Sequence, residues 1–146
     1  MNSKTVGFIG LGNMGGRMTR CLVNAGLSVL GFDTDAERVR TAGAQVAESV
    51  AKVAAEAGVV LLSLPDSKVV EAVVEGPNGL LAHCREGQVV VDLSTAAASS
   101  TIRLHGLFAE RGVQYVDAGI SGGAAAAEKG ALTLMVGGDA ATVDAL

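Results

Sequence analysis

The sequence predicts an α/β fold with a doubly wound, mainly parallel sheet and helices on both of its faces. The first observation is an alternation of short apolar runs with longer helical patterns along the 146 residues, which is typical of parallel strands joined by helices. The second is an excess of glycine, 20 residues against two prolines, which indicates close backbone approaches and no linker. The length suits one domain with a core, and no domain boundary is evident.

The expected strands are short runs of mostly apolar residues. They are Thr5–Ile9, Leu27–Phe32, Val59–Leu64, Gln88–Leu93, Val113–Val116 and Leu132–Val136. The run Val59–Leu64 is almost wholly apolar, which predicts a strand buried on both of its faces.

The expected helices lie between these runs. They are Met14–Ala25, Asp35–Thr41, Ser49–Ala57, Ser67–Val74, Ser99–Arg111 and a last helix that begins at Asp139 and is cut by the chain end. In the first, Met14, Met18 and Cys21 recur at helical spacing on one face, and Gly26 follows in the usual stop position. The small-residue stretch Gly122 to Ala127 receives no assignment.

Composition and charge argue against several classes of partner. A net charge of −4 gives no electrostatic reason to expect nucleic acid or an anionic membrane. Val59 to Leu64, the longest apolar run, is too short to span a bilayer, and the N-terminus matches a cleavable signal poorly. Cys21 and Cys84 lie far apart without metal-ligand spacing, so we expect reduced thiols, no metal site and a cytoplasmic protein.

Three glycines between the first strand and the first helix follow the pattern G-x-G-x-x-G, at Gly10, Gly12 and Gly15. Gly10 permits a tight turn, Gly12 lets the backbone approach a pyrophosphate, and Gly15 lets helix and strand pack closely. The helix N-terminus that follows offers N–H groups and a partial positive charge to phosphates. The alternative is a purely structural turn, but that interpretation does not account for the acid described next.

Asp33 ends the second strand about 20 residues further on, where a carboxylate can accept both hydroxyls of an adenosine ribose. It would repel a 2′-phosphate, and Thr34 and Asp35 offer no arginine to receive one. NAD is therefore favoured over NADP, although Arg38 lies only about one helical turn beyond. The alternative role for Asp33, capping the next helix, suits Asp35 better.

The opening stretch, GFIGLGNMGGRM, resembles the signature of the β-hydroxyacid dehydrogenases, the family of 3-hydroxyisobutyrate dehydrogenase and tartronate semialdehyde reductase. Four further stretches match in order along nearly the whole chain: LSLPD, VDLST, DAGISGG and LMVGG. The resemblance implies a Rossmann-type fold and the N-terminal NAD-binding domain of an oxidoreductase. Its reaction would oxidise the CH–OH group of a small β-hydroxyacid, 3-hydroxyisobutyrate-like, by hydride transfer to nicotinamide.

The resemblance also implies roles for individual residues. The cofactor-binding set is Gly10, Leu11, Gly12, Asn13, Met14, Gly15, Asp33, Leu64, Pro65, Ser94 and Thr95. The substrate carboxylate would be bound by Ser121, Gly122 and Gly123. Singly, several positions have structural alternatives: Met14 as core, Pro65 as a helix start, Ser94-Thr95 as a helix cap and Gly122-Gly123 as a turn.

The substrate half departs from the family pattern more than the cofactor half. The family usually has proline where this chain has Ala98 and Gly119, glycine at Ala126 and threonine at Ala131. Which hydroxyacid is used is therefore left open.

The family's acid–base group is a lysine followed four positions later by asparagine. The lysines here are Lys4, Lys52, Lys68 and Lys129, and they are followed at that spacing by Phe8, Glu56, Ala72 and Thr133. The catalytic lysine is therefore expected beyond Leu146, in a C-terminal helical domain through which the enzyme forms a homo-oligomer. His83 and His105 are interpreted as surface residues, and Lys129 as solvated.

Two alternatives stay open. One is a related NADP-dependent enzyme, an imine reductase or a 6-phosphogluconate dehydrogenase. The other is a dinucleotide-binding module without turnover.

Overall fold

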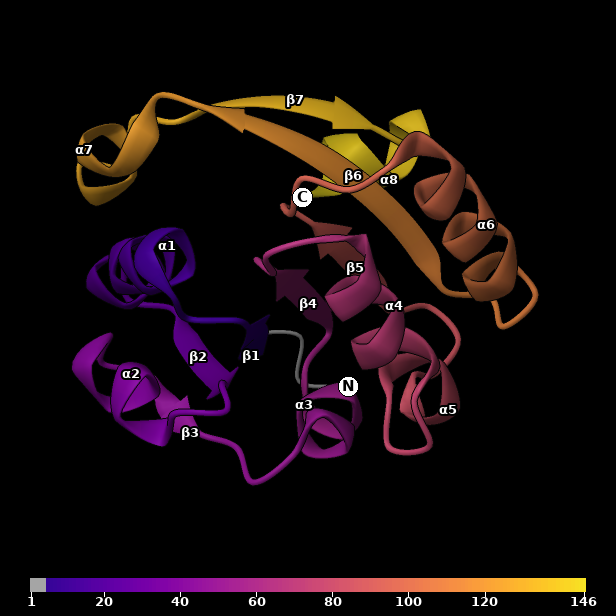
Figure 1. The fold of residues 1–146 in the computed structure, drawn as a ribbon, viewed down its shortest axis with the longest axis horizontal. Helices are drawn as coiled ribbons and strands as arrows, with labels where there is room; N and C mark the ends of the chain where they lie inside the picture. Colours follow the sequence, from indigo (N-terminus) through magenta and orange to yellow (C-terminus); the bar gives the residue numbers. More distant parts are fainter. Residues whose placement is uncertain (1–4) are drawn as a thin grey trace.

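A computed structural model describes residues 5–146, and within that range seven strands form one sheet of order β3-β2-β1-β4-β5-β6-β7 (Figure 1). The strands are β1 (Thr5–Ile9), β2 (Ser28–Phe32), β3 (Gln45–Val46), β4 (Val59–Leu62), β5 (Val89–Asp92), β6 (Gln114–Ser121) and β7 (Thr133–Gly137). All neighbouring strands pair parallel except β6 and β7, which pair antiparallel. The predicted fold class is confirmed.

The helices connect successive strands, except for the last one, which follows β7. They are α1 (Asn13–Asn24), α2 (Ala36–Thr41), α3 (Val50–Glu56), α4 (Ser67–Glu75), α5 (Leu80–His83), α6 (Ala98–Ala109), α7 (Gly123–Glu128) and α8 (Ala140–Ala145). Side chains cap four of them, because Asp35, Ser49, Asp66 and Asp139 each accept a hydrogen bond from a backbone N–H in the first turn. None of the described helices is both long enough and apolar enough to cross a membrane.

Alternating strand residues build two apolar layers, one on each face of the sheet. Ile9, Leu30 and Val90 belong to the layer that packs against α3 to α6. Their chain neighbours Phe8, Val29 and Val91 belong to the layer on the side of α1 and α2. This period of two is what a pleated strand covered on both faces requires.

On the α1 side the sheet is incompletely covered. An apolar groove of about 570 Å³ runs over the strands between α1, α7 and α8. Val59 and Leu61 line it and are only partly buried, whereas Val60 and Leu62 are fully buried on the other face. The prediction that this strand is buried on both faces is therefore wrong for the described chain, because α3 and α4, which flank β4 in sequence, both pack on the opposite face.

The C-terminal third also differs from expectation. The strand predicted at Val113–Val116 continues to Ser121, because residues 117 to 121 pair with β7 in a hairpin. This hairpin extends from the edge of the sheet in Figure 1. The short helices α5 and α7 were not predicted, and α7 occupies most of the stretch Gly122 to Ala127.

Candidate functional site

The turn after β1 is closely packed by its neighbours. Gly10 has a positive φ of 88°, and a Cβ atom there would lie 2.2 Å from the carbonyl oxygen of Ser63. A Cβ atom on Gly15 would lie 1.9 Å from the carbonyl oxygen of Gly10. The structural reasons predicted for these two glycines, a tight turn and close helix–strand packing, are thus confirmed.

Gly12 differs from both. Its φ is −71°, which any residue adopts, and a Cβ atom there would meet only the Arg38 guanidinium, at 4.0 Å. The space beside its backbone is open. Gly12 is also the N-cap of α1, whose first turn has no side-chain cap and no acidic residue. An open backbone beside uncapped helical N–H groups fits a pyrophosphate.

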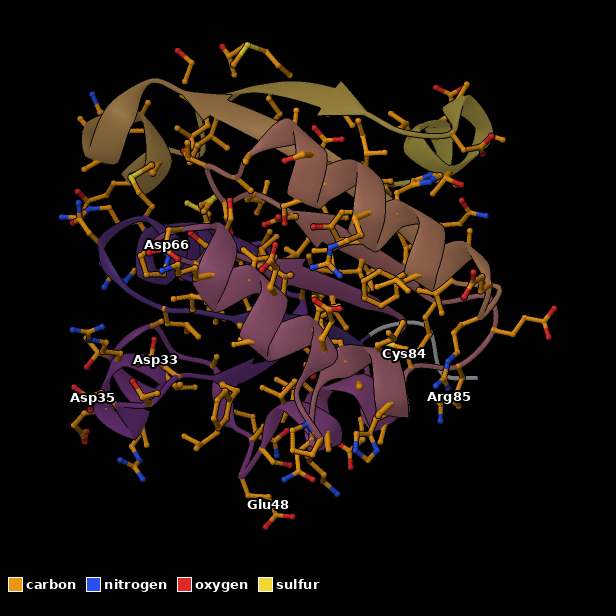
Figure 2. All side chains as sticks on the ribbon, turned by 45° about the vertical axis from the view of Figure 1, so that its right-hand side comes forward. Asp33, Asp35, Glu48, Asp66, Cys84 and Arg85 are labelled. Carbon is orange, nitrogen blue, oxygen red and sulfur yellow. The ribbon has the colours of Figure 1, made fainter. Side chains whose placement is uncertain are left out.

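Asp33 follows β2 and lies against this turn (Figure 2). Its Oδ2 accepts a hydrogen bond from the Leu11 N–H at 2.8 Å, and its Oδ1 accepts one from the Asp35 N–H at 2.9 Å. The side chain is only 8% exposed. Asp35 caps α2 by accepting from the Glu37 N–H, so capping does not explain Asp33. The carboxylate is held where it can also accept ribose hydroxyls.

Arg38 reaches back toward the same place. Its guanidinium lies 3.9 Å from Asp33 Oδ1 and 3.8 Å from Asp35 Oδ2. A polar cleft of about 370 Å³ lies here between α1 and α2, with Gly12 and Arg38 in its wall. Two acids flank one cation beside the expected ribose position, an arrangement less favourable to a 2′-phosphate than a free arginine.

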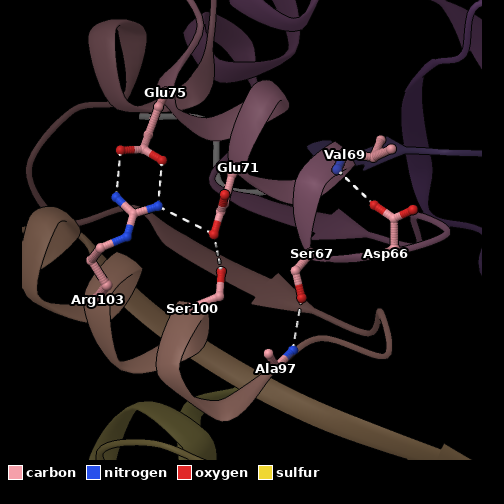
Figure 3. Close-up of polar contacts among 8 residues, drawn as sticks. All are labelled: Asp66, Ser67, Val69, Glu71, Glu75, Ala97, Ser100 and Arg103. Atoms are coloured by element: carbon pink, nitrogen blue, oxygen red, sulfur yellow. Dashed lines mark hydrogen bonds and ion pairs between the residues drawn. The ribbon is translucent and has the colours of Figure 1, made fainter.

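The turns after β4 and β5 are tied together. Ser94 Oγ accepts the Leu64 N–H at 2.9 Å. Ser67 Oγ accepts the Ala97 N–H at 2.8 Å, the bond drawn in Figure 3. The first residue of α6 is Ala98, with Ala97 as N-cap and no side-chain cap. A capping role for Ser94-Thr95 is therefore excluded.

Pro65 and Thr95 are exposed at these two turns. Asp66 is the N-cap of α4, so Pro65 precedes the cap and does not open the helix. Met14 is half-buried on α1, which leaves its core interpretation and its cofactor interpretation both possible.

A buried acid supports the turn after β5. Asp92 Oδ1 accepts the Ser94 N–H at 2.9 Å, and Asp92 Oδ2 accepts the Tyr115 hydroxyl at 2.9 Å. Burial, followed by the charge of Asp92, raises the pKa of Tyr115 well above its ordinary value. Sequence reasoning gave neither residue a role. The available signal was an acid ending an otherwise apolar strand directly before Leu-Ser-Thr.

The substrate candidates lie one strand further along. Ser121 is the last residue of β6, and Gly122 and Gly123 follow with φ of 132° and 72°. All three are exposed. A Cβ atom on Gly122 would lie 2.7 Å from that of Ala126, whereas one on Gly123 would meet no atom within 4 Å. A structural turn therefore explains glycine at position 122 by the close contact with Ala126, and glycine at position 123 only by its positive φ.

All these groups share the carboxyl edge of the parallel strands. Their order along that edge follows the strand order: Asp33 after β2, Gly10 after β1, Leu64 after β4, Ser94 after β5 and Ser121 at the end of β6. The order in which successive strands are added to the sheet reverses between β1 and β4, which is the switch point at which open α/β sheets bind ligands. In Figure 2, Asp33 and Asp66 lie on one side of the molecule, and Cys84 and Arg85 lie toward the other.

Within residues 5–146, no lysine is followed four positions later by an asparagine. His83 and His105 are exposed on α5 and α6, as predicted. Lys52 is paired with Glu56 at 2.6 Å, and Lys129 is exposed at the end of α7. Lys4 lies outside the described residues. Within residues 5–146, no cluster of three or more His, Cys, Asp or Glu side chains suits a metal ion.

Comparison with known proteins decides the family. The model of the NAD binding domain of 6-phosphogluconate dehydrogenase matches residues 5–146. The chain belongs to this family of NAD-binding domains. Among its relatives, a 2-(hydroxymethyl)glutarate dehydrogenase of Eubacterium barkeri is 43% identical over 95% of this chain and 47% of its own length. The resemblance to hydroxyacid dehydrogenases is confirmed, and so is the assignment of NAD.

Solved structures agree with the family assignment. A 3-hydroxyisobutyrate dehydrogenase of Mycobacterium tuberculosis with L-serine has a TM-score of 0.91 and 35% identity, covering 97% of this NAD-binding domain and 49% of that chain. A structure described as Psf3 in complex with NADP+ and 2-OPP has a TM-score of 0.91 and 33% identity, covering 96% and 51%. The NAD-binding domain described here therefore spans about half the length of these relatives.

Proposed function

We propose that this domain binds NAD along the carboxyl edge of its sheet, within an oxidoreductase that acts on the CH–OH group of a small β-hydroxyacid. One observation carries the cofactor half: the Asp33 carboxylate is fixed 2.8 Å from the Leu11 N–H, directly beside the open backbone of Gly12. Relatives named as hydroxyacid dehydrogenases support the reaction class.

Each part of the dinucleotide would have its own strand end. Asp33 accepts the adenosine ribose hydroxyls, while the backbone at Gly10, Leu11 and Gly12 and the α1 N-terminus, at Asn13, Met14 and Gly15, face the pyrophosphate. Leu64 and Pro65 border the nicotinamide half, and Ser94 and Thr95 lie by its ribose. When bound, nicotinamide supplies the hydride acceptor. The residues of this chain bind and orient it.

The substrate carboxylate would lie one strand further, at Ser121, Gly122 and Gly123. Support comes from their exposure at the end of β6, which pairs with β5, the strand that precedes Ser94. A hydroxyl and closely spaced backbone N–H groups suit an anion. The exact hydroxyacid is not part of the proposal.

The proton would be transferred by a lysine in a second, helical domain that follows Leu146. Two observations support this. The chain spans about half the length of its relatives, and the groove beside α8 leaves Leu134 and Leu146 about half-exposed, a surface suited to burial against more protein. A homo-oligomer would form through the same domain. The two free cysteines support a reducing compartment such as the cytoplasm.

A direct titration tests the cofactor assignment. NADH and NADPH are titrated separately into the purified chain, and binding is followed by calorimetry or nucleotide fluorescence. We expect saturable NADH binding that is tighter than NADPH binding, because Asp33 repels a 2′-phosphate. Tighter binding of NADPH would favour the related NADP-dependent enzymes and contradict the assignment. Binding of NADH without hydroxyacid oxidation in the extended protein would favour a module without turnover.

A further inference from the structure

A continuous chain of hydrogen bonds runs from the interior of the sheet to the turn after β4. The Tyr115 hydroxyl on β6 donates to Asp92 Oδ2 at 2.9 Å. Asp92 Oδ1 accepts the Ser94 N–H at 2.9 Å, and Ser94 Oγ accepts the Leu64 N–H at 2.9 Å. These bonds link the first part of β6 with the turns that follow β4 and β5.

Because its residues are buried, this series of hydrogen bonds is sensitive to the loss of any one of them. Tyr115 is 2% exposed and Asp92 is 1% exposed. When a buried carboxylate oxygen loses its hydrogen-bond donor, the free-energy cost of leaving that oxygen unsatisfied exceeds the net stabilisation that the bond contributed. Tyr115 is therefore suited to hold Asp92, and through it the Ser94 turn, in one position.

The last residue in this series of hydrogen bonds, Leu64, lies against the turn after β1 that contains Gly10. A Cβ atom on Gly10 would lie 2.9 Å from Leu64 Cδ2 and 2.2 Å from the Ser63 carbonyl oxygen. The Ser67–Ala97 bond ties the same two turns a second time. Ser94 is thus tied to the turn that packs against Gly10, and Tyr115 binds the acid that supports Ser94.

We propose that Tyr115 is a positioning residue for the nicotinamide half of the dinucleotide, acting through Asp92 and the Ser94 turn. The inference rests on the proposed NAD site. It assigns Tyr115 no contact with the cofactor, and it leaves the adenosine half, at Asp33 and Gly12, independent of Tyr115.

The test compares two ligands in a Tyr115→Phe variant. NADH spans the whole site, whereas ADP lacks the nicotinamide riboside and reports only on the adenosine and phosphate half. By calorimetry, we expect Tyr115→Phe to weaken NADH binding about five-fold, which corresponds to about 1 kcal/mol, the scale of one hydrogen bond. The affinity for ADP should stay unchanged.

Phe108→Leu provides the matched control. The ring of Phe108 stacks on that of Tyr115 with centroids 5.3 Å apart, so this variant disturbs the packing of Tyr115 and keeps its hydroxyl. We expect a lower Tm with an unchanged ratio of NADH to ADP affinity. If Phe108→Leu changes that ratio as Tyr115→Phe does, the role is one of packing alone and the inference is wrong.

Ser94→Ala gives a second, independent variant. It should show the same selective loss of NADH binding, and the double variant should lose less than the product of the two single losses, because both act in one chain of bonds. Equal weakening of NADH and ADP by Tyr115→Phe would overturn the inference. Failure of the unmodified chain to bind NADH would overturn the proposed function and this inference with it.

Discussion

At the residue scale, Gly12 separates a structural role from a ligand role. A Cβ atom there meets only Arg38, at 4.0 Å, and the φ of −71° is open to any residue. Gly12→Val should therefore keep the fold but abolish NADH binding, because the side chain fills the space that the pyrophosphate needs. Circular dichroism and a fluorescence titration measure the two effects. Gly106→Ala, on open helical surface, is the control that should bind normally. A Gly12→Val variant with normal affinity would leave the glycines a structural role only.

Asp33 supports a second prediction at this scale. Asp33→Ala should weaken NAD binding by about 1–3 kcal/mol, the range for losing a charged hydrogen-bond partner. Because Asp33 also accepts the N–H groups of Leu11 and Asp35, Asp33→Asn is the gentler companion, keeping the shape and removing the charge. It should reduce the preference for NADH over NADPH in parallel titrations. An unchanged preference in Asp33→Asn would mean that charge repulsion does not select the cofactor.

At the element scale, α4 and α6 are joined by Arg103. Its guanidinium donates to both carboxylate oxygens of Glu75, at 2.6 and 2.7 Å (Figure 3), and lies 3.3 Å from Glu71. The hydrogen bonds from Arg103 lower the pKa of Glu75 below its ordinary 4.5. A carboxylate whose pKa is depressed in the folded state stabilises the fold above its unfolded pKa, and this contribution is lost as the pH falls through the folded pKa.

Glu75→Gln should therefore lower the Tm at pH 7, by about 1–3 °C for a partly exposed pair. The Tm difference from the unmodified chain should shrink below pH 4.5. It should vanish once Glu75 is protonated in both the folded and the unfolded protein. Thermal unfolding at a series of pH values measures it. Glu37→Gln, whose carboxylate meets Arg40 within a single helix at 3.4 Å, should have a smaller effect. A Tm difference that is constant with pH would exclude the ion pair as its cause.

The β6–β7 hairpin carries the substrate prediction. Ser121 and its register partner Thr133 are both exposed. In the complete enzyme, Ser121→Ala should raise the KM for hydroxyacids with little effect on matching neutral alcohols, because only the acids carry the carboxylate that Ser121 would bind. Thr133→Ala is the control on the neighbouring strand and should change neither. Steady-state kinetics with both types of substrate measure these effects. An equal effect of Ser121→Ala on hydroxyacids and neutral alcohols would contradict the assignment.

At the scale of the whole molecule, binding and turnover should separate. The proposed cofactor groups lie between Gly10 and Thr95, so the 146-residue chain should bind NADH. None of its lysines has an asparagine partner at the family's spacing, and loss of general acid–base catalysis alone costs a factor of about 10² to 10⁴. We expect no detectable oxidation of 3-hydroxyisobutyrate or glycerate in a coupled absorbance assay. Robust turnover would place the acid–base group within this chain and direct attention to Lys129.

The sequence by itself determined the alternation of elements and the sheet edge at which the candidate site residues lie. Gly10, Gly15 and Asp33 were predictable because each answers a local requirement: a positive φ, a close backbone approach, or an acid at a fixed distance along a βαβ unit. The ends of β4 and β5 followed from topology, since parallel strands present their carboxyl ends at one edge. Asp33 could be distinguished from a helix cap because Asp35 stood closer to the helix.

Tertiary structure alone decided the rest. The length of β6 depends on pairing with β7, which lies beyond an intervening helix, and the apolar pattern of β4 cannot reveal that one of its faces lies in a groove. The bond from Tyr115 to Asp92 joins residues 23 apart, and Arg38 reaches Asp33 only because α2 turns back toward β2. Such contacts form between elements once they pack, so the local pattern that specifies each element carries no record of them.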